Sequence, residues 1–120
     1  MRGKTHLTRS EDFDRVHRQG NSWAASILVL RAAPNNRDDS RFGMSVSKKV
    51  GNAVTRNRIK RRLREIINML PLRPGWDLVI IVRPAAAALG FAQFKDCLER
   101  LLVRAKLLVK QDEAPGLKTD

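Results

Sequence analysis

The sequence predicts a single α+β domain, and three features support that prediction. Residues 76–82 form a nearly continuous apolar run, which is typical of a central β-strand. Residues 91–109 repeat apolar side chains at spacings of three and four, which is typical of a helix packed on a core. The 120 residues, 42% of them hydrophobic, are enough for one core and show no internal repeat or linker. We expect one domain over residues 1–120, structured from about residue 7 to about residue 110, with a flexible tail at 111–120.

A short first helix is expected to begin near Thr8 and to end at Gly20. Thr8 and Glu11 have the Ser/Thr-x-x-Glu spacing of a capping box, in which two side chains satisfy free backbone N–H groups. Three residues then share one helical face: Phe13, Val16 and His17. Such a short helix depends on packing against the rest of the domain.

Three strands follow from the residue patterns. Residues 23–33 are rich in β-branched and long aliphatic side chains, residues 41–46 alternate apolar with small residues, and residues 76–82 are continuously apolar. The sequence PNNRDD between the first two strands is turn-forming, so we expect an antiparallel hairpin there. Residues 83–90, RPAAAALG, are expected to be a helical or turn connection.

The last helix is expected to run from about Phe91 to Val109. Its apolar stripe is Phe94, Cys97, Leu98, Leu101, Leu102, Ala105 and Leu108. Because Cys97 lies on this stripe, we expect a buried core thiol rather than a reactive one. A lone cysteine has no partner for a disulfide or a zinc site, which fits a reducing cytoplasm.

The net charge is +12 at pH 7 and the isoelectric point is near 11.3. Such a chain repels itself, so a polyanionic partner is expected, with nucleic acid favoured over an anionic membrane surface. No apolar run approaches the about 18 residues of a spanning helix, and the N-terminal segment lacks the apolar region of a secretory signal. We therefore expect no membrane partner.

Much of the charge lies in one segment, because residues 48–64 contain eight Lys or Arg residues and no acid. Asn52 or Thr55 can cap a helix that runs to about Leu70. At 100° per residue, one side of this helix is apolar, with Ile59, Leu63, Ile66, Ile67 and Leu70. The opposite side holds Asn57, Lys60, Arg61 and Arg64, and one flank holds Arg58 and Arg62.

This helix is expected to bind a polyanion. Like charges four residues apart lower helix stability by a few tenths of a kcal/mol per pair. A bound phosphate backbone would make the electrostatic contribution favourable. Lys48 and Lys49 add charge near the helix N-terminus, which itself attracts phosphate. A merely solvated face would carry interspersed acids, and they are missing. Charge alone does not separate DNA from RNA.

The segment SVSKKVGNAVTRNRIKRRLRE (45–65) closely resembles the signature of the bacterial ribonuclease P protein subunit, whose RNR motif corresponds to Arg56, Asn57 and Arg58. The segments DFDRVHRQGNSWA, FGMSVSKK and DLVIIVRP resemble other parts of the family, and the likeness covers about residues 7–110. The resemblance implies the order α-β-β-β-α-β-α with a four-stranded sheet. The residues alone predict three strands. Either residues 23–33 form two strands, or the residue patterns miss one strand.

The resemblance also implies a function, that of accessory subunit of a ribonucleoprotein endoribonuclease in the cytoplasm. A large catalytic RNA with Mg²⁺ hydrolyses one phosphodiester and removes the 5′ leader from precursor tRNA; the protein has no active site or metal site of its own. By this likeness the RNA contacts are Lys48, Lys49, Asn52, Arg56, Asn57, Arg58, Lys60, Arg61, Arg62 and Arg64. The leader contacts are Phe13, Val16, His17 and Arg83. No DNA partner is implied.

One residue departs from the family pattern, because His17 stands where the family often has a second aromatic. A histidine can stack on a base, but the aromatic platform is thinner. His17 is equally interpreted as a surface residue, and Phe13 has an alternative role as a core anchor of its helix.

Three other functions compete with this one. A nuclease site in the protein needs metal-binding carboxylates or an acid/base pair, and the twelve acids are scattered. A ribosomal or other structural RNA-binding protein would share the charge and fold, and only the ordered motif argues against it. A DNA-binding protein that reads the major groove with the basic helix would need a dimerisation element, and none is recognisable.

Overall fold

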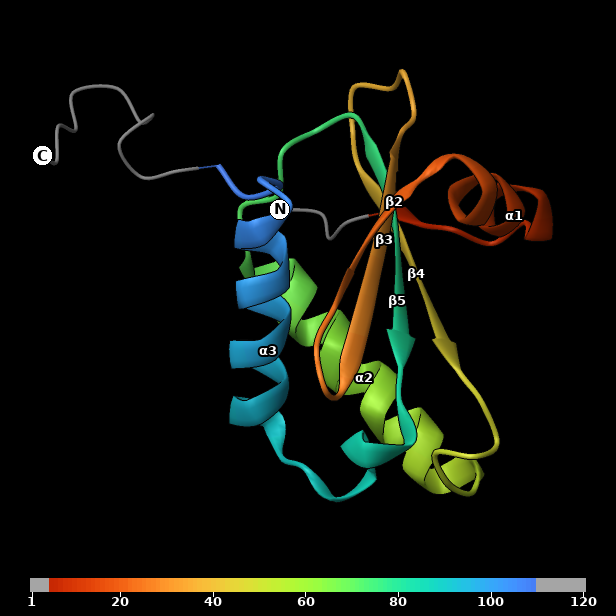
Figure 1. Cartoon of the computed structure of the whole chain (residues 1–120), viewed down its shortest axis with the longest axis vertical. Helices are drawn as coiled ribbons and strands as arrows, with labels where there is room; N and C mark the ends of the chain where they lie inside the picture. The colour runs from red at the N-terminus through yellow and green to blue at the C-terminus, as the bar shows by residue number, and fades with distance from the viewer. Residues whose placement is uncertain (1–4, 110–120) are drawn as a thin grey trace, which may run out of the picture.

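The computed structural model describes residues 5–109 and contains a mixed β-sheet with helices on both faces (Figure 1). The strands are β1 (Thr5–His6), β2 (Asn21–Ala24), β3 (Leu28–Pro34), β4 (Arg41–Val46) and β5 (Trp76–Val82). The helices are α1 (Ser10–Gln19), α2 (Ala53–Met69) and α3 (Phe91–Arg104), with a 3-10 helix η1 at Pro84–Ala88. The predicted tail at 111–120 lies outside the described residues.

β5 is the central strand, as its continuous apolar sequence predicts. The strand order is β1-β4-β5-β3-β2, and β5 pairs in parallel with β4 and antiparallel with β3. The strands β2 to β5 are the four that the family resemblance implies, so that prediction is confirmed. The two-residue β1 extends the sheet by pairing in parallel with β4.

The hairpin predicted between residues 23–33 and 41–46 is wrong. Residues 23–33 belong to two strands, β2 and β3, which form a hairpin with each other. Across their turn the N–H of Ala25 donates to the carbonyl of Leu28 (2.9 Å). β5 lies between β3 and β4 in the sheet. The residue pattern misleads because no glycine or proline marks the turn, and because β3 pairs with a strand that is distant in the chain.

The two faces of the sheet carry cores of different size. α2 and α3 cover one face, where Leu30, Phe42, Ile80 and Phe94 are fully buried (Figure 1). α1 lies on the other face, over a small core of four buried residues: Leu7, Val16, Ala33 and Val79. Because this core is small, the position of α1 depends strongly on its polar contacts.

α1 begins at Ser10 with Arg9 at the N-cap, so the predicted capping box of Thr8 and Glu11 is wrong. The backbone N–H of Leu7 donates to a carbonyl of β4 (2.8 Å), which keeps the preceding chain extended along that strand. The chain therefore reaches Arg9 before it can turn into a helix, and no side chain caps the first turn.

The predicted end of α1 is confirmed, since the helix stops at Gln19 and Gly20 follows. A Cβ atom at Gly20 would lie 2.5 Å from the carbonyl oxygen of Val16 and 2.8 Å from that of Ala32. Only glycine therefore lets the helix end this close to β3.

α3 ends at Arg104, before the predicted end at Val109. Lys106 adopts a left-handed φ of 60°, and the N–H of Leu107 donates to the carbonyl of Leu102 (2.9 Å). This is the long hydrogen bond of a Schellman motif, which ends a helix. Leu107 is buried by the turn, so the apolar spacing continues past the helix end and conceals it.

Cys97 packs against the large core from α3, but it is half-buried rather than fully buried. Burial raises the pKa of its thiol. Since the thiolate is the reactive form, this environment favours a packing role, as the sequence predicts.

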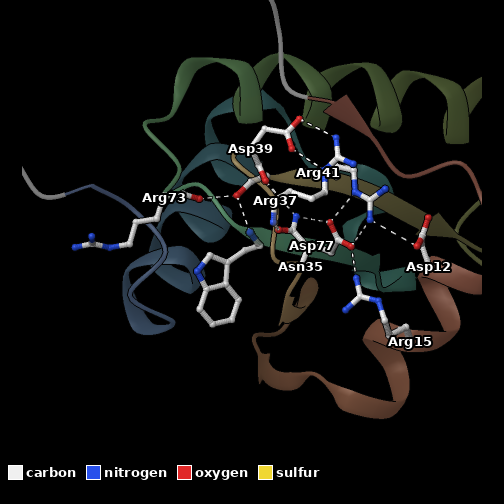
Figure 2. Close-up of polar contacts among 10 residues, drawn as sticks. Asp12, Arg15, Asn35, Arg37, Asp39, Arg41, Arg73 and Asp77 are labelled. Atoms are coloured by element: carbon white, nitrogen blue, oxygen red, sulfur yellow. Dashed lines mark hydrogen bonds and ion pairs between the residues drawn. The ribbon is translucent and has the colours of Figure 1, made fainter.

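A buried carboxylate, that of Asp77 at the start of β5, joins α1 to the sheet (Figure 2). Its Oδ1 accepts from Nε of Arg41 (2.9 Å) and from Nδ2 of Asn35 (2.9 Å), and its Oδ2 accepts from Nη2 of Arg41 (2.7 Å). Arg15 of α1 also donates to Oδ2. Asp12 of α1 approaches Nη2 of Arg41 at 3.6 Å. Two strands, a turn and a helix thus meet at one carboxylate.

Burial by itself raises the pKa of the Asp77 carboxyl, but hydrogen bonds from Arg41 and Asn35 and the charges of Arg41 and Arg15 outweigh it. The pKa therefore lies below its ordinary value. A carboxylate with a lowered folded-state pKa stabilises the fold above its unfolded pKa of about 3.9, and this stabilisation is lost as the pH falls through the folded-state pKa.

Asp77→Asn is expected to lower the free energy of unfolding at pH 7 by about 2–3 kcal/mol. This is less than a fully buried pair would lose, because Arg15 and Arg41 retain partial access to water. The variant should also lose less stability than the wild type between about pH 5 and about pH 3, because it has no carboxylate to protonate.

Urea titrations across this pH range measure both effects. The control is Asp96→Asn, which breaks an exposed pair with Arg100 (3.2 Å) and should have a much smaller effect. Equal losses in the two variants would contradict a special role for Asp77.

Candidate RNA interface

α2 carries the predicted basic segment, and both its ends and its buried face agree with the prediction. Its N-terminus is capped by Asn52, whose Oδ1 accepts from the N–H of Thr55 (2.9 Å). The apolar stripe is buried against the sheet and α3: Ile59, Leu63, Ile66, Ile67 and, just after the helix, Leu70. Packing on this stripe orients the basic residues.

The predicted RNA contacts divide into an exposed group and a half-buried group. Exposed are Lys48, Lys49, Asn52, Asn57 and Arg61. Half-buried are Arg56, Arg58, Lys60, Arg62 and Arg64. Lys60 and Arg64 are predicted opposite the apolar stripe, but they are half-buried and line a pocket together with Phe42, Gly43 and Met44 of β4, which places them on the flank of α2 beside the sheet.

None of the eight Lys and Arg residues over 48–64 forms an ion pair within residues 5–109. Arginines elsewhere in that range, such as Arg41 and Arg100, do pair with carboxylates. The positive charge of the segment is therefore not neutralised by the described part of the chain, and it is available to an external polyanion.

Two arginines of the segment are held by backbone carbonyls instead. Nε of Arg56 donates to the carbonyl of Gly51 (3.2 Å), and Nη1 of Arg62 donates to that of Leu89 (3.3 Å). Nε of Arg58 is buried and has no hydrogen-bond partner among the described residues. These contacts restrict the side chains without neutralising them.

Two of the predicted leader contacts, Phe13 and Val16, lie where α1 meets the sheet. Phe13 is half-buried, and its ring lies on the backbone of β4, where a Cβ at Gly43 would be 2.4 Å from its Cζ. Val16 is fully buried in the small core. Its side chain therefore positions α1 and is not open to direct contact.

The other two, His17 and Arg83, are exposed. The backbone oxygen of His17 accepts from Nη2 of Arg31 (2.5 Å), while Arg83 follows β5 and donates to the turn between β2 and β3 (3.2 Å). Between α1 and Arg83 the sheet presents half-buried Val29 and Ile81, which pair across β3 and β5. His17 and Arg83 thus lie at two ends of one apolar face of the sheet.

The residue patterns did not single out Arg31, Val29 or Ile81 for this surface. Arg31 gives a signal, since it is the one charged residue in an otherwise apolar strand. Val29 and Ile81 give no such signal, because apolar residues in a strand are typical of a core. They are only half-buried because α1 is too short to cover them.

The described residues 5–109 contain no group of three or more His, Cys, Asp or Glu side chains that could hold a metal ion. Across the same range, no helix has the length and apolarity needed to cross a membrane. What the interface offers chemically is cations that have no ion pair within the described part of the chain, a half-buried aromatic ring and an apolar sheet face.

Comparison with known proteins places the chain in one family. It matches the family Ribonuclease P over residues 1–106. It is 40% identical over 120 residues to the ribonuclease P protein component of Dehalococcoides mccartyi strain CBDB1, covering 100% of both chains. It is 46% identical over 108 residues to that of Roseiflexus castenholzii, covering 88% of each.

Solved structures agree with the sequence relatives. The ribonuclease P protein of Staphylococcus aureus superposes with a TM-score of 0.80 at 34% identity, covering 87% of this chain and 97% of that one. The protein of Thermotoga maritima gives 0.75 at 30% identity, covering 84% and 97%. The fold implied by the RNR segment is thereby confirmed. The chain therefore belongs to the ribonuclease P protein family and is a protein component of that endoribonuclease.

Proposed function

We propose that this protein binds the catalytic RNA of ribonuclease P through the basic segment at 48–64 and contacts the 5′ leader of precursor tRNA beside α1. Ribonuclease P is a tRNA-processing ribonucleoprotein, so the protein has an RNA partner. The observation that carries the proposal is a set of eight cations that form no ion pair within residues 5–109, on and before a helix that the core holds in place.

The electrostatics of α2 support an RNA contact. The pairs Arg58/Arg62 and Lys60/Arg64 place like charges four residues apart, which is unfavourable in the free protein. Binding of RNA phosphates replaces that repulsion with attraction, and it releases counterions from the RNA. Backbone bonds already restrict Arg56 and Arg62, so less side-chain freedom is lost on binding.

The surface beside α1 supports contact with a single strand. Phe13 offers a half-buried ring, His17 an exposed one, and Arg83 a cation at the far end of an apolar sheet face formed by Val29 and Ile81. Unstacked bases bind to such rings and apolar surfaces while cations hold the backbone.

We further propose that Mg²⁺ for phosphodiester hydrolysis is held mainly by the RNA subunit. The described part of the chain has no cluster of ligands that fits this ion. On this proposal the protein supplies binding and orientation, and the particle acts in the cytoplasm.

The purified protein alone is expected to leave precursor tRNA intact. Addition of the cognate catalytic RNA with Mg²⁺ should release the 5′ leader, at lower magnesium than RNA alone requires, because cations of the protein replace metal ions at the RNA surface. Gel analysis of labelled precursor measures both. Leader removal by an RNA-free preparation of the protein would overturn the proposal.

Replacing Arg56, Arg58 and Arg62 with alanine should weaken binding to catalytic RNA. The slope of log affinity against log salt should become shallower by about 0.7–0.9 for each phosphate that the variant no longer neutralises. The matched control removes three cations from α3, namely Lys95, Arg100 and Arg104, and changes net charge equally. If both triple variants flatten the slope alike, the effect is one of net charge and α2 does not bind the RNA directly.

Phe13→Ala should lower the affinity of the holoenzyme for leader-bearing tRNA while sparing that for mature tRNA, because only the former has a base to stack on this ring. Phe13 also packs on β4, so Phe13→Leu is the companion variant that keeps apolar volume and removes the aromatic face. The ratio of the two affinities is the readout. A parallel loss for both substrates in the Leu variant would assign Phe13 to packing alone.

A further inference from the structure

The turn between β2 and β3 is held by two arginines that come from different elements. Nη1 of Arg83, at the end of β5, donates to the carbonyl of Ala25 (3.2 Å). Nη1 of Arg104, at the end of α3, donates to the carbonyl of Ala24 (3.0 Å). Two neighbouring peptide groups of one turn are therefore fixed by two guanidinium groups, one reaching from the sheet and one from a helix.

This turn has little conformational preference of its own. Short hairpin turns favour residues with positive φ, because that conformation matches the twist of the two strands. Residues 24–28 contain no glycine, and none of them has a positive φ. The side chain of Ile27 is buried in the large core and anchors one side of the turn. The direction of the neighbouring carbonyls therefore depends on the groups that bind them.

Arg104 reaches the turn across a pocket. The pocket has a volume of about 590 Å³ and lies between the turn and α3, and both Ala24 and Arg104 line it. Because this space separates the turn from the helix, side-chain packing between them is incomplete. The hydrogen bond from Arg104 supplies a direct link between α3 and the turn.

We propose that Arg104 is a positioning residue for Arg83, the residue that the proposed function assigns to the 5′ leader. Arg104 fixes the turn, and the carbonyl of Ala25 in that turn holds one N–H of Arg83. Arg83 is exposed, so its other N–H groups remain available to a phosphate. An arginine that is already held loses less side-chain freedom when it binds, so the fixed turn raises leader affinity. This positioning role rests on the proposed leader contact of Arg83 and adds a residue from the helix on the opposite face of the sheet.

The order of the turn in the free protein provides the first test. Arg104→Met keeps a long side chain and removes the donor to Ala24. The matched control is Arg100→Met, which changes the net charge equally; Arg100 also lines the pocket but pairs with Asp96 of its own helix (3.2 Å). The ¹⁵N order parameter of Ser26 should fall in Arg104→Met and stay unchanged in Arg100→Met. A turn that is equally ordered in both variants would overturn the proposal.

The affinities of the holoenzyme for tRNA with and without the leader provide the second test. Arg104→Met should lower the ratio of these affinities about threefold, the order expected when one long side chain loses its restraint. Arg104→Lys, which keeps the charge and a donor, should retain most of the ratio, and Arg100→Met should leave it unchanged. In an Arg83→Ala background, Arg104→Met should have no further effect, because Arg104 acts through Arg83.

The combined results distinguish a failed positioning role from a failed leader contact. If Arg83→Ala lowers the ratio and Arg104→Met does not, the positioning role is overturned and the leader contact stands. If Arg104→Met lowers the ratio equally with and without the Arg83 side chain, Arg104 acts on its own, which also overturns the positioning role alone. If Arg83→Ala leaves the ratio unchanged, the leader contact of Arg83 and the positioning role are both overturned.

Discussion

The attachment of α1 to the sheet depends on the buried carboxylate of Asp77. α1 is the one helix in the described part that lies on its face of the sheet, and the core beneath it has four buried residues. Arg15 from the helix and Arg41 from β4 converge on Asp77. Charge burial is costly, so such a cluster adds little net stability compared with apolar packing, but its hydrogen bonds link α1 to β4 and β5. The orientation of α1, and with it the place of Phe13, therefore depends on this cluster together with the packing of Val16 on the sheet.

α2 combines a structural and a functional role, and each constrains the other. Its apolar stripe must be buried for the large core to form, so its cations cannot rotate away from the surface. The favourable packing of the stripe offsets the repulsion among those cations. A helix without the stripe would relieve the repulsion by fraying. The core of this protein therefore maintains a charge distribution that the helix alone would not sustain.

Local patterns predicted the elements whose causes are local. α2 followed from its cap and its period, and β5 from a run of apolar residues long enough to be covered on both faces. The insertion of β5 between β3 and β4 did not follow, because strand order is decided by contacts between distant segments. The predicted capping box of Thr8 and Glu11 is wrong for the same reason, since β4 holds the residues before α1 extended. At the candidate site, the basic segment was visible in the sequence, whereas the approach of His6 and Met44 to it was not.

The structure also gives different surroundings to two pairs of cations on α2 that the sequence assigns to the same RNA partner. Arg58 and Arg62 lie on the flank where Arg62 bonds a carbonyl of the loop before α3. Lys60 and Arg64 lie on the flank that faces aromatic rings and a thioether. The first flank can hold phosphate regardless of base sequence, because a guanidinium binds phosphate without contact to a base. The second places charge beside half-buried Phe13 and Met44, so a ligand that reaches these cations also meets an apolar surface. The two sides of one basic helix thus differ in their surroundings, which are backbone carbonyls on one side and aromatic and apolar side chains on the other.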